Sequence, residues 1–292
     1  MKGADYQLVT TPGGASVYSV ADQETFHPVA GPEAEALALY VHQLRLIERG
    51  HAAARRGNEF VIWDVGLGAG GNVCTVLRAM RETGARLRVV SFERTLAPLE
   101  FALQHAAELP FLRDFDATLR VLLTQGAVSL AAVGLTGEWE LHVGDFPTLV
   151  RDPRGQLPRP DAVLFDAFSP AKNPAMWSLP VFQAIRSRVG TEGRGELSTY
   201  SRATLVRTAL LLAGWYVGRG DAIAGKEETT VAATHRADLR APLGVDFLRR
   251  VDVSAAAEPL QSGEYFRGRI TPEHRQRLWQ HPQFHGNGGL GE

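Results

Sequence analysis

Four acidic residues each stand at the end of a short element of the chain, and their side chains carry its most obvious chemistry. They are Asp64, Glu93, Asp145 and Asp166. A carboxylate in such a place can accept hydrogen bonds from a ligand's hydroxyl or amino groups, or take a proton from a reacting amine. Taken singly, each residue fits a helix N-cap or a surface acid equally well. Together at one edge of a sheet they would form a ligand site.

The residues around Asp64 predict a strand, a glycine turn and a helix. Residues 60–65 are apolar and rich in β-branched and aromatic types, and a helical pattern begins at Asn72. Three glycines lie between them at alternate positions: Gly66, Gly68 and Gly70. Bare backbone before a helix N-terminus lets a ligand approach closely. The spacing differs from the G-x-G-x-x-G of dinucleotide loops, so with Asp64 before it the loop predicts S-adenosylmethionine as cofactor. A turn needed only for helix–strand packing is the alternative.

Two further acids extend the predicted cofactor site. Glu93 lies 27 positions after Gly66, at the end of the second expected strand, where a carboxylate can accept both ribose hydroxyls. Asp145 precedes Phe146, a pair that suits adenine because the carboxylate accepts from the exocyclic amine and the ring covers the base. The residues expected to bind the cofactor are Asp64, Gly66, Gly68, Gly70, Asn72, Glu93, Asp145 and Phe146.

The segment 166–177, Asp-Ala-Phe-Ser-Pro-Ala-Lys-Asn-Pro-Ala-Met-Trp, predicts a substrate loop. We expect Asp166 to be catalytic: it would face the transferred methyl group, orient a neutral amine and accept its proton. Alignment of the amine with the methyl group would contribute most of the rate. The residues of the loop expected to bind substrate are Phe168, Lys172, Asn173, Pro174 and Trp177. A rigid turn that only supports the sheet is the alternative.

The charge of the chain is balanced but uneven. The net formal charge is −1, which gives no global signal for nucleic acid. Residues 151–220, however, hold ten basic and five acidic side chains. This block predicts contact with tRNA or another phosphate-bearing partner. Solvated arginine-rich helix faces explain the same excess without any partner.

The rest of the composition predicts a soluble, cytoplasmic protein with no membrane or metal partner. Cys74 is the only cysteine, so an internal disulfide is not possible and a reducing compartment is the simple inference. Its place in the expected glycine-loop helix indicates packing and not nucleophilic chemistry. No signal peptide opens the sequence, and no apolar run reaches the ~18 residues that would span a membrane.

Strands and helices must alternate to position these residues. Strands are expected at 60–65, 87–92, 140–143, 162–165 and 195–200, with a closing hairpin of 214–217 and 229–234. Helices are expected at 32–49, 72–81, 98–108, 180–188 and 202–213, with helix and loop over 109–137. This alternation predicts an α/β domain with a doubly wound, mainly parallel seven-stranded sheet. Right-handed crossovers then bring Gly66, Glu93, Asp145 and Asp166 to one edge.

Both ends of the chain are expected to add to this domain. Short strands at 7–10, 16–19 and 25–29 predict a small β-hairpin layer, which with the helix that follows makes an N-terminal extension over 1–50. The methyltransferase domain is expected over 51–240. A tail over 241–292 is expected to pack on the domain or to be partly disordered, with its last eight residues frayed.

Several of these motifs resemble those of the MnmC-type methyltransferases. Residues 166–177 resemble the family's D-G-F-x-P-x-K-N-P-x-M-W signature, and 64–72 resemble its acid-x-G-x-G-x-G-x-N loop. The pairs Ser91/Glu93 and Gly144/Asp145, the strand 198–201 and the helix end 206–215 also match, so the resemblance runs from about 60 to 234. It implies the class I methyltransferase fold, S-adenosylmethionine as cofactor and Asp166 near the substrate amine, with Tyr200 also at the substrate. It implies methylation of the aminomethyl group of 5-aminomethyl(-2-thio)uridine at the tRNA wobble position.

The sequence departs from that family in three places. Bifunctional members carry a flavin-dependent oxidase domain, for which this chain has no room, so only methyl transfer is implied and no flavin is expected. Lys226-Glu-Glu-Thr229 stands where the family typically has K-R-x-M, which replaces a base with an acid. The segment 24–28, Glu-Thr-Phe-His-Pro, resembles the lid of polyamine aminopropyltransferases. An enzyme of the same fold with a small amine substrate, and a non-catalytic RNA-binding protein, are therefore the alternative functions.

Overall fold

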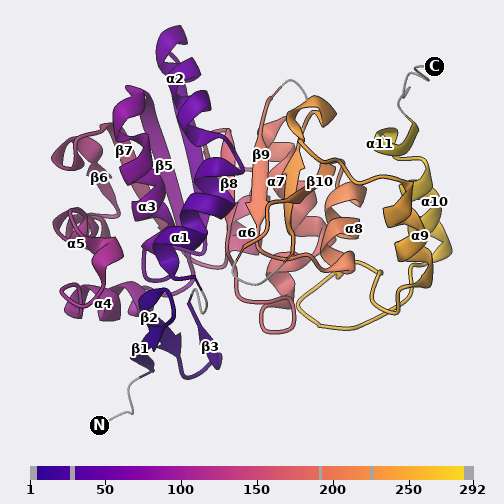
Figure 1. The fold of residues 1–292 in the computed structure, drawn as a ribbon, viewed down its shortest axis with the longest axis horizontal. Helices are drawn as coiled ribbons and strands as arrows, with labels where there is room; N and C mark the ends of the chain where they lie inside the picture. The colour runs from indigo at the N-terminus through magenta and orange to yellow at the C-terminus, as the bar shows by residue number, and fades with distance from the viewer. Residues whose placement is uncertain (1–4, 27–29, 191–192, 224–226, 286–292) are drawn as a thin grey trace.

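An eight-stranded, mainly parallel sheet with helices on both faces forms the centre of the molecule. The computed structural model describes residues 5–26, 30–190, 193–223 and 227–285. The strands run across the sheet in the order β10-β11-β9-β8-β4-β5-β7-β6. Figure 1 shows β5 and β7 in one half, β8, β9 and β10 in the other, and the separate β1–β3 sheet below them. The α/β class expected from the alternation of elements is confirmed.

Most expected strands of the central sheet begin and end close to the expected positions, but β7 begins at Thr136, four residues before the strand expected over 140–143. Their bounds are β4 (Glu59–Val65), β5 (Arg86–Glu93), β6 (Ala127–Ser129), β7 (Thr136–Val143), β8 (Ala162–Phe165), β9 (Glu196–Thr199), β10 (Tyr216–Gly220) and β11 (Thr229–Ala233). The expected count of seven strands is wrong by one, because β6 pairs antiparallel with β7 at the edge. This strand has only three residues, Ala-Val-Ser, of which only the valine has a large apolar side chain, so it leaves little signal in the sequence.

Side chains of β4 alternate between two hydrophobic cores, one on each face of the sheet. Phe60 and Ile62 join the core under helices α3 (Gly71–Met80), α4 (Ala97–Gln104) and α5 (Asp116–Gln125). Val61 and Trp63 join the core under α6 (Phe146–Arg151), α7 (Leu179–Val189) and α8 (Thr204–Leu212). Burial on both faces is the reason why this parallel strand is apolar at every position from Phe60 to Trp63.

The helix expected over 32–49 is instead three pieces. They are α1 (Pro32–Ala36), the π-helical turn η1 (Leu37–His42) and α2 (Leu46–Arg56), with Arg45 in the left-handed region at φ 51° between the last two. Gly50 does not end the helix as expected, and Gly57 does. A Cβ on Gly50 would lie 2.6 Å from the Met80 side chain, so this glycine permits close packing of α2 on its neighbour.

Both ends of the chain pack on this core. Strands β1 (Tyr6–Thr11), β2 (Gly14–Ser19) and β3 (Glu24–Thr25) form the antiparallel N-terminal sheet. Of the strand expected over 25–29, Phe26 already lies beyond the end of β3, and residues 27–29 lie outside the described residues. In the tail, Leu248 of α9 (Val245–Val253) and Leu278 of α10 (Pro272–Trp279) are buried in the core under α8.

A short third helix, α11 (Pro282–His285), ties the tail to the edge of the sheet. The Gln283 side chain donates to the carbonyls of Val217 and Leu243 and accepts from the Val217 amide. The last eight residues, expected to be frayed, lie almost entirely outside the described part of the chain. Within the described residues, none of the helices combines the length and apolar character that crossing a membrane requires.

Candidate active site

A cavity of about 530 Å³ opens at the edge of the sheet where β4, β5, β7 and β8 end. Gly66, Glu93, Asp145 and Asp166 all line it, so these four residues meet at one edge. The strand order reverses at β4, with β5 and β7 on one side of it and β8 and β9 on the other. Open α/β sheets bind ligands at such a reversal point.

The glycine turn after β4 forms one wall of the cavity. Gly66 and Gly68 line it with φ angles of +95° and +51°, which side-chain-bearing residues rarely adopt. A Cβ on Gly66 would lie 2.9 Å from the carbonyl oxygen of Asp166, so the turn and the end of β8 touch through backbone. Gly70, also at positive φ, faces leucine side chains and does not line the cavity.

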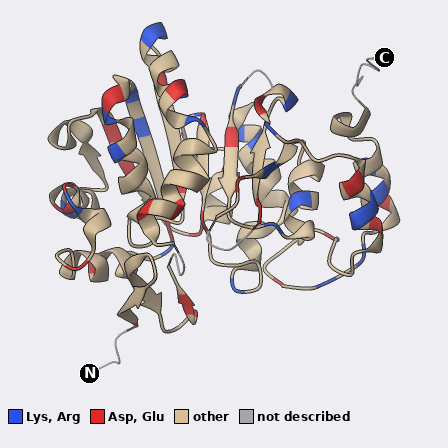
Figure 2. Cartoon of the chain, viewed as in Figure 1, with Lys and Arg blue, Asp and Glu red and all other residues tan. Residues whose placement is uncertain are grey.

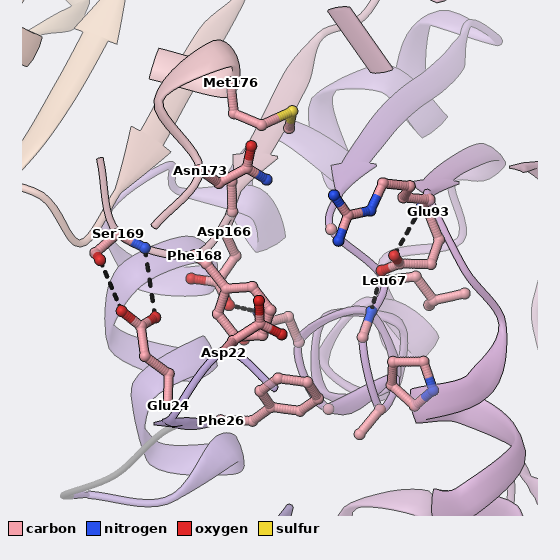
Figure 3. A pocket seen from close by; sticks show the side chains of 18 of the residues that line it. Asp22, Glu24, Phe26, Leu67, Glu93, Asp166, Phe168, Ser169, Asn173 and Met176 are labelled. Atoms are coloured by element: carbon pink, nitrogen blue, oxygen red, sulfur yellow. Dashed lines mark hydrogen bonds between the residues drawn. The ribbon is translucent and has the colours of Figure 1, made fainter. Parts of the chain in front are cut away.

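Glu93 is held at the cavity wall by backbone amides. Its Oε2 accepts from the Gly68 amide at 2.9 Å, and its Oε1 accepts from the amides of Arg94 at 2.7 Å and Thr95 at 3.3 Å. The carboxylate therefore has one position relative to the glycine turn, as Figure 3 shows. Oε2, which accepts only from the Gly68 amide, keeps further lone-pair capacity for a ligand hydroxyl.

Asp145 lines the same cavity and also caps a helix. Its Oδ2 accepts from the backbone amide and the hydroxyl of Thr148, in the first turn of α6. Asp145 is therefore a helix N-cap through one of its oxygens, and it also lies on the cavity wall. Phe146 follows on the wall, with its ring edge-on to Phe92 at 4.9 Å between centroids.

Asp64 lies beneath the cavity and not on its wall. It is 1% exposed, and its Oδ2 accepts from the Ser91 hydroxyl at 2.7 Å, which in turn accepts from the Trp139 indole. Burial raises the pKa of Asp64 to about 7, and the charges of Asp166 and Glu93 act in the same direction, while the Ser91 hydrogen bond opposes them. The structure places this residue as a support under the turn.

Asp166 stands where the glycine turn and the substrate loop meet. The Asn72 side-chain amide, from the first turn of α3, donates to its Oδ2 at 2.6 Å. Two tyrosines lie close to it, Tyr40 fully buried in η1 and Tyr200 just after β9. Burial raises the pKa of both phenols well above the ordinary value, and the Asp166 charge adds to each shift. Both phenols therefore stay protonated, as potential hydrogen-bond donors, near this carboxylate.

The substrate loop brings only part of its predicted residues to the cavity. Phe168 and Asn173 of the loop line it, as does Tyr200 after β9, whose hydroxyl donates to the Ala167 carbonyl at 2.9 Å. Trp177 is fully buried and instead shapes the loop, because its indole donates to the Phe168 carbonyl at 2.7 Å.

Two other residues of this loop also lie off the cavity wall. Pro174 begins the 3-10 turn η5 (Pro174–Trp177), and Lys172 is exposed. The lysine side chain therefore stands outside the cavity, on the surface next to Asn173.

The N-terminal sheet supplies a wall that the sequence motifs do not predict. Glu24 accepts from the backbone amide and the hydroxyl of Ser169, at 3.4 and 2.7 Å. The Phe26 ring lies 5.4 Å from the Phe168 ring and would lie 3.6 Å from a Cβ on Gly68 (Figure 3). The lid-like segment 24–28 was the available signal; its His27 and Pro28 lie outside the described residues.

The cavity wall is strongly acidic. Among the described residues that line it, the acidic ones are Asp22, Glu24, Glu35, Glu93, Asp145 and Asp166. Among the same described lining residues, Arg94 is the only basic one. This excess suits a cationic ligand, and S-adenosylmethionine carries its methyl group on a sulfonium. The open backbone at Gly66 and Gly68, the fixed Glu93 carboxylate and the cavity volume all fit such a cofactor.

In the segment that departs from the family pattern, the two described acids form ion pairs with arginines of the chain. Lys226 lies outside the described residues. Glu227, where the family has a base, is exposed and pairs with Arg202 at 3.7 Å. Glu228 pairs with Arg207 at 2.8 Å, and Arg207 is only 2% exposed, so this acid neutralises a buried guanidinium.

Comparisons with known proteins identify the family of the chain. Residues 121–235 match the family model described as S-adenosyl-L-methionine-dependent methyltransferase. The chain is 32% identical over 215 residues to the tRNA 5-methylaminomethyl-2-thiouridine biosynthesis bifunctional protein MnmC of Pseudomonas fluorescens. The matched region covers 66% of the chain and 30% of that protein. The protein of the same name from Azoarcus is 33% identical over 222 residues, 72% of the chain and 33% of its own length. The chain thus spans about a third of the length of these relatives.

A solved structure shows the same fold. The crystal structure of MNMC2 from Aquifex aeolicus superposes with a TM-score of 0.70 at 22% identity, over 97% of this chain and 85% of that one. The description of the family model names the cofactor and the reaction class, and the curated relatives carry the MnmC name. The chain is an S-adenosyl-L-methionine-dependent methyltransferase domain of the MnmC type.

Proposed function

We propose that this domain methylates the aminomethyl nitrogen of 5-aminomethyl(-2-thio)uridine at the wobble position of tRNA. The names of the curated relatives support this proposal, and they favour it over a small-amine substrate or a non-catalytic RNA-binding role. The relatives are named as bifunctional proteins, and the chain spans about a third of their length, so the proposal concerns methyl transfer alone. The observation that carries the proposal is the Asp166 carboxylate, fixed by Asn72 between the glycine turn and the substrate loop in an acidic cavity.

The cofactor would occupy the side of the cavity made by β4, β5 and β7. Glu93 would accept from the ribose hydroxyls, and Asp145 with Phe146 would hold the adenine. The glycine turn would lie along the methionine part, where side chains are absent. When bound, S-adenosylmethionine supplies an electrophilic methyl group on a positively charged sulfur.

Asp166 would act on the amine. A protonated amine has no lone pair, so the carboxylate must accept a hydrogen bond from the neutral amine and hold it toward the methyl group. As the nitrogen–carbon bond forms and the sulfur–carbon bond breaks, with its electron pair left on sulfur, the nitrogen becomes cationic. Asp166 can then take one of its protons and pass it to solvent. Phe26 and Phe168 would exclude water from this side.

The proposal is tested by mass spectrometry of tRNA nucleosides. Purified protein is incubated with S-adenosylmethionine and with tRNA that carries the aminomethyl nucleoside. The expected product is the same nucleoside with its mass increased by that of one CH2 group, and with the new methyl group on the aminomethyl nitrogen. Transfer to free polyamines but not to tRNA would overturn the proposal in favour of the small-amine substrate.

A further inference from the structure

A surface loop of the tail carries two exposed aromatic side chains beside two arginines. Tyr265 is 43% and Phe266 40% exposed, in a protein whose other large aromatic side chains in the described residues are mostly covered. Arg267 and Arg269 follow, both exposed. Neither arginine forms an ion pair within the described part of the chain, whereas the nearby Arg275 is paired with Asp252. We call residues 261–269 the aromatic-basic loop.

The aromatic-basic loop is pinned at its base and is not a frayed end. The amides of Ala257 and Glu258 both donate to the Gly268 carbonyl, at 2.9 and 3.0 Å. The Glu258 carboxylate, 8% exposed, accepts from the Thr271 amide and contacts His274 at 2.7 Å. The chain therefore leaves and returns at one fixed point, which limits the entropy that ligand binding would remove.

The loop adjoins the substrate side of the cavity. The Leu260 carbonyl accepts from the Leu179 amide at 2.8 Å, and a Cβ on Gly263 would lie 3.8 Å from that of Ala175. Ala175 belongs to η5, next to the cavity residue Met176. Tyr265 is two residues from Gly263, so its Cα is within about 7 Å of that contact.

Two figures show this placement from the same direction. In Figure 1 the golden segment between α9 and α10 runs along the lower side of the molecule, where the β1–β3 sheet also lies. Figure 2 shows blue basic positions in this segment. The exposed Lys172 belongs to the loop after β8, beside the cavity residue Asn173.

We propose that the aromatic-basic loop binds the single-stranded RNA that flanks the target nucleotide. A base that enters a cavity leaves the stack, and its neighbours lose a stacking surface. The exposed aromatic rings of the loop, which contacts η5 beside the cavity, would replace that surface, and its arginines would neutralise the adjoining phosphates. This inference rests on the proposed function and assigns part of its RNA recognition to a segment outside the matched family model, which ends at residue 235.

The test measures binding of a labelled anticodon stem-loop RNA, with uridine at the wobble position, to the full chain by fluorescence anisotropy. Tyr265→Ala should weaken binding about 5- to 50-fold, since one stacked base is lost. Tyr265→Phe keeps the ring and should bind as the wild type does, whereas Tyr265→Leu keeps apolar bulk without a stacking face and should resemble the alanine variant. A fully paired RNA hairpin should not distinguish these variants.

A matched pair of arginine variants separates local contact from general charge. The double variant Arg267→Ala/Arg269→Ala should weaken stem-loop binding and reduce the slope of log Kd against log salt by about one or more. Arg55→Ala/Arg56→Ala removes two exposed arginines of α2, which lies at the opposite side of the molecule in Figure 1, and should leave both quantities near wild type. Calorimetry with S-adenosylmethionine should give unchanged affinity for all of them.

The outcomes also separate this inference from the proposed function. If the wild type methylates tRNA and the aromatic and arginine variants bind and methylate it equally well, the loop does not contact RNA and the inference is wrong. If the wild type neither binds the stem-loop nor methylates tRNA, the proposed function fails first. A melting temperature within a few degrees of wild type shows that each variant is folded.

Discussion

The side-chain amide of Asn72 donates a 2.6 Å hydrogen bond to the carboxylate of Asp166. The two residues lie 94 positions apart in the sequence, one at the start of the helix after the glycine turn and the other at the end of β8. The acid that would act on the substrate is therefore positioned by the element that would hold the cofactor.

Replacement of Asp166 should separate chemistry from cofactor binding. Asp166→Asn keeps the size of the side chain but cannot accept a proton, so kcat for methyl transfer should fall about 10²- to 10⁴-fold. Cofactor affinity, measured by calorimetry, should stay within about threefold, because Glu93 and Asp145, and not Asp166, are proposed to hydrogen-bond the cofactor. Equal losses in both quantities would place Asp166 in the cofactor site instead. Asn72→Ala, which removes the hydrogen bond to the acid, should give a smaller loss of kcat.

Glu93 should contribute to cofactor affinity and not to the chemical step. Glu93→Ala should weaken S-adenosylmethionine binding by about 1.5–3 kcal/mol, the scale of hydrogen bonds to charged groups. Glu93→Gln tests whether the negative charge is required, since it keeps an acceptor for the Gly68 amide. The control is Glu48→Ala, which removes an exposed acid from α2. Unchanged affinity in the Glu93→Ala calorimetric titration would remove this residue from the cofactor site.

The Phe26 and Phe168 rings should contribute to cofactor and substrate binding as a pair. A double-mutant cycle with Phe26→Leu and Phe168→Leu should give a coupling of about 0.5–1.5 kcal/mol in the binding of S-adenosylmethionine, since each ring buries the other. Additive effects of the two changes would show that the contact between the N-terminal sheet and the substrate loop does not support binding.

Asp64 should make stability depend on pH in the cofactor-free protein. Its pKa is about 7 in the folded chain against 3.8 for an exposed carboxyl, so between these values the folded state keeps a proton that the unfolded state releases. The free energy of unfolding therefore falls as pH rises through this window and stays lower above it.

The Asp64→Asn variant mimics the protonated form and should lack this dependence. Relative to wild type it should gain about 2–3 kcal/mol of stability between pH 5 and pH 8, measured by urea denaturation. The exposed Asp116, changed to Asn, serves as control and should leave the pH profile parallel to wild type. A parallel profile for Asp64→Asn would mean that Asp64 is ionised in the folded chain.

Residues at strand ends were open to prediction because topology alone brings them together. The acids Glu93, Asp145 and Asp166 follow apolar runs, and parallel strands place their carboxyl ends at one edge. Trp177 shows the limit of such reasoning. The composition of the loop suggested a substrate contact, but only the packed structure shows that the indole points into the core and holds the Phe168 carbonyl.

Two other features depend on contacts that no local pattern encodes. The N-terminal strands are short and partly polar, and nothing in their periodicity says that Glu24 and Phe26 reach residues more than 140 positions away. The tail lacks the continuous periodicity of a long helix, yet Leu248 and Leu278 are buried against the domain. Long-range packing of short elements decides both cases.

The strand order also has a consequence for how this kind of enzyme can diversify. Glu93 and Asp145 come from the β5–β7 half of the sheet, whereas the loop 166–177 comes from β8, on the other side of β4. On the proposed assignment of residues, changes in the loop would alter which acceptor is recognised and leave unchanged the residues that would face the nucleoside of the cofactor. Acceptor preference and donor preference would then be largely separable traits.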